Sequence, residues 1–187
     1  MNDTLFFVGP MGAGKTTIGR RLARQLGLEF VDLDLALMER TGADISLIFD
    51  IEGEEGFRRR ESALLAELAT RPRCIIATGG GIVLREENRQ VLKSHGFVVY
   101  LAVTVERQLK RLAKDKIRPL LQTPDREQRL IAMAEQRNPL YREVADVTID
   151  SDGRNVGAMA RRVERRLRQI PALRDSGLWH KTRETSR

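Results

Sequence analysis

The stretch Leu5-Phe6-Phe7-Val8-Gly9-Pro10-Met11-Gly12-Ala13-Gly14-Lys15-Thr16 decides the fold of this 187-residue chain. Its first four residues are apolar and β-forming, and Gly9 to Thr16 match the pattern G-x-x-x-x-G-K-[ST]. Beyond the motif, Ile18, Leu22 and Leu26 recur at helical spacing. A strand, a glycine loop and a helix in this order form a phosphate-binding loop (P-loop), in which backbone N–H groups and the helix N-terminus surround phosphate oxygens.

The loop predicts contacts to a nucleoside triphosphate and a metal ion. Lys15 is expected to reach the β- and γ-phosphates, and the Thr16 hydroxyl to ligate Mg²⁺. The residues assigned to ATP from this motif are Gly12, Ala13, Gly14, Lys15, Thr16 and Thr17. The motif alone leaves open which molecule accepts the phosphate, or whether hydrolysis drives motion instead.

Four more apolar runs follow, separated by helical or polar segments. The strands are expected at residues 28–32, 74–78, 98–103 and 147–149, with short helices around residues 35–38 and 45–49 and a longer one over 54–70. This alternation predicts an α/β fold of the P-loop NTPase type, with three layers (α/β/α) and a five-stranded parallel sheet, in one domain over residues 1–170.

Two segments lack helical or strand periodicity. Residues 114–124 hold Lys114, Lys116, Arg118 and two prolines, and we expect a mobile lid loop over about residues 112–124. Arg118 would fold over the triphosphate there and neutralise charge on the transferring group. Residues 171–187 contain few apolar side chains and are expected to form a frayed, flexible tail.

Composition excludes several classes of protein. With 41% hydrophobic and 32% charged residues the chain is an ordinary globular protein, and its single Cys74 excludes an internal disulfide. No apolar stretch reaches the roughly 20 residues that span a bilayer, and near the N-terminus the apolar run is only Leu5 to Val8, with the acidic Asp3 ahead of it. We therefore expect a cytoplasmic protein that does not bind membranes.

The net charge of +7 is concentrated near the C-terminus. Residues 151–187 carry ten Lys and Arg against four Asp and Glu, which is +6 of the total. A nucleic-acid-binding P-loop protein would use these arginines against phosphates. However, Val163, Leu167 and Ile170 form an apolar stripe opposite the arginines, which is typical of an ordinary amphipathic surface helix, so no nucleic-acid partner is expected.

Two carboxylates follow the second expected strand. Asp32 and Asp34 are two residues apart, so in extended backbone they project to the same side, at the strand end where open α/β sheets bind ligands. Asp32 would help to hold Mg²⁺, and Asp34 would accept the proton of an attacking hydroxyl. The alternative is that Asp34 only caps the next helix.

Arginines and glycines supply the other candidates. Arg58 and Glu61 are three residues apart on a helix, so Glu61 can hold the guanidinium for an anionic substrate, although a solvated helix face is the alternative. Gly79-Gly80-Gly81 follows a strand and favours close approach of a ligand, with a plain turn as the alternative. Arg137 is expected to end a helix just before Pro139 and to point into the cleft.

Together these motifs resemble the shikimate kinases over roughly residues 4–169. The resemblance rests on Gly9 to Thr16, Asp32-Leu33-Asp34, Gly53 to Arg58, Gly79-Gly80-Gly81, Arg118 to Leu121 and Arg137-Asn138-Pro139-Leu140-Tyr141. It implies transfer of the γ-phosphoryl group of ATP to the 3-hydroxyl of shikimate, in the pathway to chorismate and the aromatic amino acids. It also implies a monomer that needs Mg²⁺.

The resemblance also implies a role for each matching residue. It assigns catalysis to Asp34, Lys15 and Arg118. It assigns binding of the metal ion to Thr16 and Asp32. Arg58 and Arg137 would bind the carboxylate of shikimate. The rest of that substrate would be bound by Asp34, Gly79, Gly80 and Gly81. Arg111 and Arg154, with Asn155, would flank the adenine.

Other kinases with the same core are the nearest alternatives. A gluconate kinase would share the P-loop and the acidic pair but would not predict the three glycines together with Arg137 to Tyr141. An adenylate kinase would need a larger lid than residues 112–124 provide.

Overall fold

The computed structural model describes residues 3–113, 125–151, 155–174 and 176–179. Its centre is a parallel sheet in the order β2-β3-β1-β4-β5. The strands are β1 (Leu5–Val8), β2 (Glu29–Asp32), β3 (Cys74–Ala77), β4 (Phe97–Ala102) and β5 (Val147–Asp150). The predicted five-stranded parallel α/β sheet is therefore confirmed.

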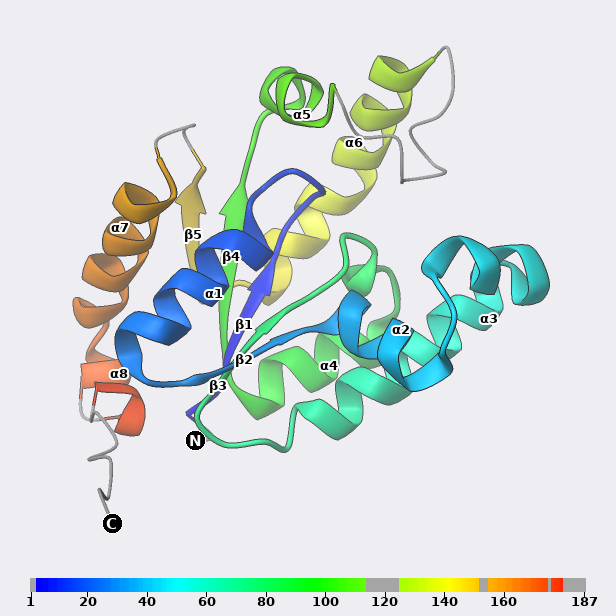
Figure 1. Ribbon diagram of the computed structural model, residues 1–187. Coiled ribbons are helices and arrows are strands. Elements are labelled where there is room, and N and C mark those ends of the chain that lie inside the picture. The colour runs from blue at the N-terminus through cyan, green and yellow to red at the C-terminus, as the bar shows by residue number, and fades with distance from the viewer. Residues whose placement is uncertain (1–2, 114–124, 152–154, 175, 180–187) are drawn as a thin grey trace.

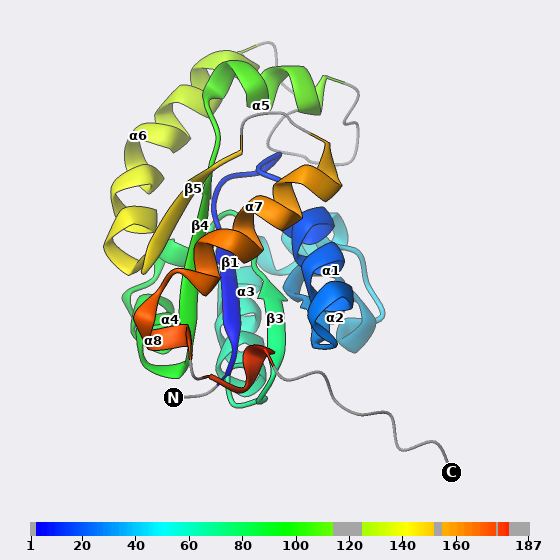
Figure 2. The same ribbon diagram turned by 90° about the vertical axis from the view of Figure 1, so that its left-hand side faces the viewer.

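Helices cover both faces of this sheet (Figures 1 and 2). They are α1 (Lys15–Leu26), α2 (Leu33–Thr41), α3 (Ile45–Leu68), α4 (Glu86–His95), α5 (Val105–Leu112), α6 (Arg126–Val144), α7 (Val156–Arg168) and α8 (Pro171–Arg174). Two 3₁₀ turns, η1 (Ile82–Leu84) and η3 (Gly177–Trp179), complete the described elements. The three-layer arrangement matches the prediction.

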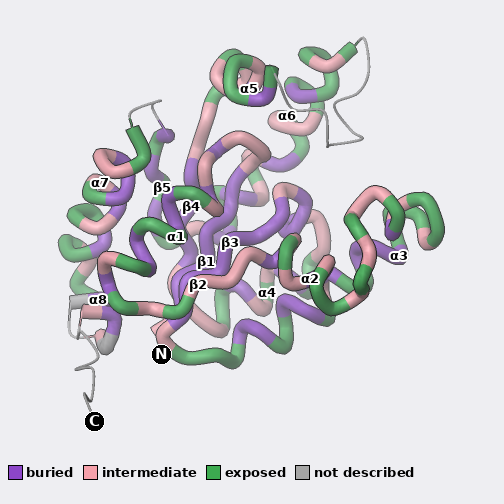
Figure 3. Tube along the Cα trace, viewed as in Figure 1, coloured by how far each residue is buried: buried purple, intermediate pink, exposed green. Residues whose placement is uncertain are grey.

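The core has two main clusters, one on each side of the sheet, and the central strands between them are buried (Figure 3). Because successive side chains of a strand point to opposite faces, Leu5 and Phe7 pack with α1 and α7, whereas Phe6 and Val8 pack with α3, α4 and α6. All four β1 side chains are fully buried, which explains why this strand is a continuous apolar run. Within the described ranges, no helix is both long and apolar enough to cross a membrane.

Helix α3 bends at Gly53. This glycine has φ 69°, in the left-handed region that side chains with a Cβ rarely adopt, so the two helical segments meet at an angle. The short helix expected near residues 45–49 and the longer one from residue 54 are both present, and the second ends at Leu68.

The prediction that Arg137 ends a helix is wrong. Helix α6 runs through Pro139 to Val144, although proline cannot donate the next backbone hydrogen bond. Tyr141 and Val144, in the turns after the proline, are buried in the core. Their burial outweighs the lost bond, and Arg137 lies inside the helix.

The tail expected to fray from Pro171 contains two short described elements, α8 (Pro171–Arg174) and η3 (Gly177–Trp179). Leu173 and Leu178 are 5% and 1% exposed and pack against the half of the core that α1 and α7 cover. The Arg168 guanidinium lies 4.3 Å from the centre of the Trp179 ring. Leu173, Leu178 and Trp179 thus hold a mostly polar segment against the core. Residues 180–187 lie outside the described residues.

Candidate active site

A pocket of about 730 Å³ opens at the carboxyl ends of the strands, between the P-loop, α2, α3 and α6. Its lining includes the predicted site residues Gly12, Ala13, Gly14, Lys15, Thr16, Thr17, Asp32, Asp34, Arg58, Gly79, Gly80, Gly81, Arg111 and Arg137. The fold therefore brings these residues together from six separate segments. Arg118, Arg154 and most of the expected lid lie outside the described residues.

The P-loop crosses from β1 to α1 with three glycines at positive φ, the first of which is Gly9 with φ 139°. Gly12 has φ 76° and Gly14 has φ 92°, and α1 begins at Lys15. The Lys15 ammonium donates to the carbonyl oxygens of Gly9 (2.7 Å) and Pro10 (3.0 Å). Its charge therefore lies over the loop, at the N-terminus of α1. The ammonium and the helix dipole both favour binding of an anion there.

Thr16 and Asp32 join the start of α1 to the end of β2. The Thr16 hydroxyl donates to Asp32 Oδ2 at 2.6 Å, and Asp32 Oδ1 accepts from the backbone N–H groups of Asp34 (3.1 Å) and Leu35 (3.2 Å). Asp32 rather than Asp34 thus caps α2. Asp34 lies in the first helical turn, so the extended backbone expected between the two carboxylates ends at Asp32.

The same pair fits a magnesium ion. A hydroxyl and a carboxylate are hard oxygen ligands, and Mg²⁺ takes only one or two protein ligands beside water and phosphate oxygens. In the part of the chain that the structure describes, no three His, Cys, Asp or Glu side chains gather into a metal site. Thr16 and Asp32, beside the phosphate loop, are therefore the residues that suit Mg²⁺ with a bound triphosphate.

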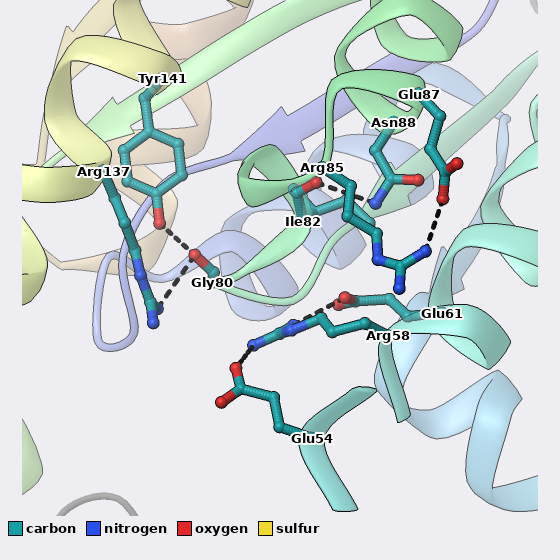
Figure 4. A network of polar contacts seen from close by, with 10 residues as sticks. All are labelled: Glu54, Arg58, Glu61, Gly80, Ile82, Arg85, Glu87, Asn88, Arg137 and Tyr141. Carbon is teal, nitrogen blue, oxygen red and sulfur yellow. Dashed lines mark hydrogen bonds and ion pairs between the residues drawn. The ribbon is translucent and has the colours of Figure 1, made fainter. Parts of the chain in front are cut away.

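Arg58 is held by two carboxylates on its own helix (Figure 4). It donates to Glu61 Oε2 at 2.7 Å and to Glu54 Oε1 at 3.2 Å, and its side chain is only 9% exposed. Burial alone would lower the pKa of Arg58, but the charges of Glu61 and Glu54 outweigh it and raise that pKa. The guanidinium remains charged inside the pocket.

Glu61 is buried beneath Arg58, with 1% of its surface exposed. Burial raises the pKa of its carboxyl, and the charge on Arg58 opposes this shift without cancelling it. A Cβ at Gly79 would lie 2.6 Å from Glu61 Oε1 and 3.0 Å from Asp34 Oδ1. The absence of a side chain at Gly79 lets these two carboxylates approach the loop.

The next two glycines contact the arginines. A Cβ at Gly81 would lie closer than 3.0 Å to the Arg58 guanidinium, so glycine leaves that space to the arginine. The Gly80 carbonyl oxygen accepts from the Tyr141 hydroxyl and, at 3.4 Å, from Arg137 Nη1 (Figure 4). Gly79-Gly80-Gly81 is therefore a loop closely approached by side chains, rather than a plain turn.

Two buried guanidiniums thus lie beside the glycine loop. Arg58 and Arg137 are 7% and 8% exposed as residues, and the buried Nε–H of each has no hydrogen-bond partner. Planar guanidiniums suit a carboxylate because they can donate two parallel hydrogen bonds.

At the far side of the P-loop, Arg111 donates to the carbonyl of Gly12 (2.7 Å) and the hydroxyl of Ser151 (2.9 Å). Val156 and Met159 give this end of the pocket an apolar surface. Asn155, expected beside adenine, accepts from the Ala158 N–H (2.8 Å) and caps α7.

Two contacts of this site were not predicted from the sequence. Ser151 gave no signal, because it binds Arg111 only through the fold. For Tyr141 the sequence does contain a signal, because this residue follows Arg137 by four positions and so lies on the same helix face.

Comparison with known proteins gives consistent matches. A family model described as shikimate kinase matches residues 11–168. The shikimate kinase of Vibrio parahaemolyticus serotype O3:K6 is 53% identical over 165 residues, which are 88% of this chain and 96% of that protein.

Solved structures agree. Shikimate kinase from Acinetobacter baumannii in complex with shikimate superposes with a TM-score of 0.85 at 47% identity, over 88% of this chain and 92% of that one. Shikimate kinase from Bacteroides thetaiotaomicron superposes with a TM-score of 0.81 at 32% identity, over 89% of this chain and 99% of that one.

Proposed function

The chain belongs to the shikimate kinase family, and from this premise we propose that it transfers the γ-phosphoryl group of ATP to the 3-hydroxyl of shikimate, giving shikimate 3-phosphate and ADP. The observation that carries the choice of acceptor is the pair of buried guanidiniums, Arg58 and Arg137, in the same pocket as the P-loop. A small alcohol that bears a carboxylate fits both groups, because the carboxylate fixes its orientation and leaves a hydroxyl facing the phosphates.

Arg58 and Arg137 bind the carboxylate of shikimate. Arg58 is already oriented by Glu61 and Glu54, so little rotamer entropy remains to be lost when the substrate arrives. The backbone of the glycine loop between them contacts the ring hydroxyls. The expected result is an acceptor held in one orientation, which is the main contribution that binding makes to phosphoryl transfer.

Asp34 contacts the reacting hydroxyl. It lines the pocket in the first turn of α2, close to the glycine loop. Its carboxylate accepts the hydroxyl proton and orients the oxygen toward the γ-phosphorus. Because phosphoryl transfer is largely dissociative, we assign more of the rate to this orientation than to removal of the proton.

Lys15 and Arg118 neutralise the charge that develops on the phosphoryl oxygens, and Arg111 and Arg154 flank the adenine. For this, the Lys15 ammonium must exchange its contacts with the Gly9 and Pro10 carbonyls for phosphate oxygens. Thr16 and Asp32 would hold Mg²⁺, which would help to neutralise the negative charge of the phosphates.

The proposal extends to the setting of the enzyme. We propose that the monomer is the active unit, as the resemblance to the shikimate kinases implies. We place it in the cytoplasm, where it supplies the pathway to chorismate, with no membrane or nucleic-acid partner.

The deciding experiment measures ADP release from ATP and Mg²⁺ by the purified protein. Parallel reactions contain shikimate, gluconate, AMP or no acceptor, and Lys15→Ala serves as the inactive control. Release with shikimate alone is the expected result. Release with gluconate or AMP would overturn the roles of Arg58 and Arg137, and release without any acceptor would identify an NTPase.

A further inference from the structure

The hydroxyl of Tyr141 lies in the core beside the glycine loop. The residue is 0% exposed, and its hydroxyl donates to the Gly80 carbonyl oxygen, in the loop that contacts the acceptor (Figure 4). Tyr141 and Arg137 are four residues apart on α6, and both reach the same carbonyl.

The two donors to Gly80 differ in strength. The Arg137 contact, at 3.4 Å, is longer than a normal N–H···O hydrogen bond, so the tyrosine is the main partner of this carbonyl. A charged donor forms shorter and stronger bonds than a neutral one when nothing competes with it. Among the residues that the structure describes, the donor that remains to this part-buried oxygen without the hydroxyl is the Arg137 guanidinium.

We propose that Tyr141 is a positioning residue for shikimate binding: its hydroxyl satisfies the Gly80 carbonyl and thereby leaves the Arg137 guanidinium available to the substrate carboxylate. The inference rests on the proposed function, since it assigns Arg137 to that carboxylate. It adds a residue that does not itself touch the substrate but controls one that does.

The surroundings hold the hydroxyl in place. The Tyr141 ring stacks on the Tyr100 ring with centroids 5.1 Å apart and planes 27° apart. Burial raises the pKa of Tyr141 well above its ordinary value, and the charge of Arg137 opposes this only in part, so the phenol remains a donor at neutral pH. Tyr100 directs its own hydroxyl elsewhere, to Asn138 Oδ1 at 3.0 Å.

Tyr141→Phe removes only the hydroxyl, and Tyr100→Phe is the matched control, since it makes the same change in the same stacked pair. Steady-state kinetics should show the KM for shikimate raised about tenfold in Tyr141→Phe, the effect of roughly one lost hydrogen bond. The KM for ATP and kcat should stay within about twofold of wild type. Tyr100→Phe should change none of the three, and circular dichroism should show that both variants are folded.

A double-mutant cycle separates positioning from a general structural effect. If Tyr141 acts through Arg137, Tyr141→Phe should have almost no further effect on kcat/KM for shikimate in an Arg137→Ala background. Equal effects in both backgrounds, an unchanged KM for shikimate, or a parallel rise in the KM for ATP would each overturn the inference. A wild-type protein without shikimate-dependent ADP release would instead overturn the proposed function.

Discussion

Replacing Gly81 by alanine tests whether the space beside the glycine loop belongs to Arg58. The backbone at Gly81 has φ −98° and ψ 1°, which alanine adopts without strain, so the effect is confined to the added methyl group. That methyl would lie closer than 3.0 Å to three atoms of the Arg58 guanidinium. Since a Cβ does not approach other atoms so closely, the guanidinium must move.

The size of the effect follows from what Arg58 loses. A hydrogen bond to a charged group contributes about 1.5–3 kcal/mol, so displacing the guanidinium from the substrate carboxylate should raise the KM for shikimate roughly 10- to 150-fold. If Glu61 also loses its partner at 2.7 Å, the free energy of unfolding falls by up to about 3–5 kcal/mol, because a buried carboxylate is left uncompensated.

The assays are steady-state kinetics with each substrate varied in turn, and urea unfolding. The KM for ATP should stay near wild type. Gly157→Ala, in α7, is the control, because its methyl meets no atom closer than 3.6 Å and should leave both KM values unchanged. A wild-type KM for shikimate in folded Gly81→Ala would refute the assignment of Arg58 to the substrate.

Three further outcomes are expected. Arg137→Ala should weaken shikimate binding and leave ATP binding largely intact, as calorimetry would show; equal loss of both affinities would contradict its role. Asp34→Asn should lower kcat by about 10²- to 10⁴-fold in a folded protein, whereas near-normal turnover would remove Asp34 from the catalytic set. Chelation of divalent cations should stop the reaction, and Thr16→Ala should raise the Mg²⁺ concentration needed for half-maximal rate; an unchanged Mg²⁺ dependence would exclude the Thr16 hydroxyl as a ligand.

The local parts of the fold were predictable from sequence. The strand from Leu5, the glycine loop and α1 follow from apolar runs, helical periodicity and a motif whose spacing is fixed by phosphate geometry. The order of the strands along the chain likewise predicted a parallel sheet. These features depend on residues close together in sequence.

The features that could not be predicted from the sequence depend on packing between segments that are distant along the chain. The continuation of α6 through Pro139 reflects burial of Tyr141, a long-range term that overrides the local preference of proline. Asp32 caps α2 because β2 ends at Asp32 and the helix begins at Leu33, so the extended backbone does not continue to Asp34. Ser151 reaches Arg111 only once β5 is in place beside β4.

The packed segment after α7 decides what the protein's intrinsic fluorescence reports. Trp179 is the single tryptophan of the chain. It stacks on Arg168 and donates to the Leu173 carbonyl. The neighbouring helix α8 lies at the end of the sheet opposite the loop between β1 and α1 (Figure 1). Tryptophan emission should therefore follow the release of the C-terminal segment during denaturation and stay nearly constant on addition of substrates. A change in emission on ligand binding would reveal mechanical coupling between the two ends of the sheet.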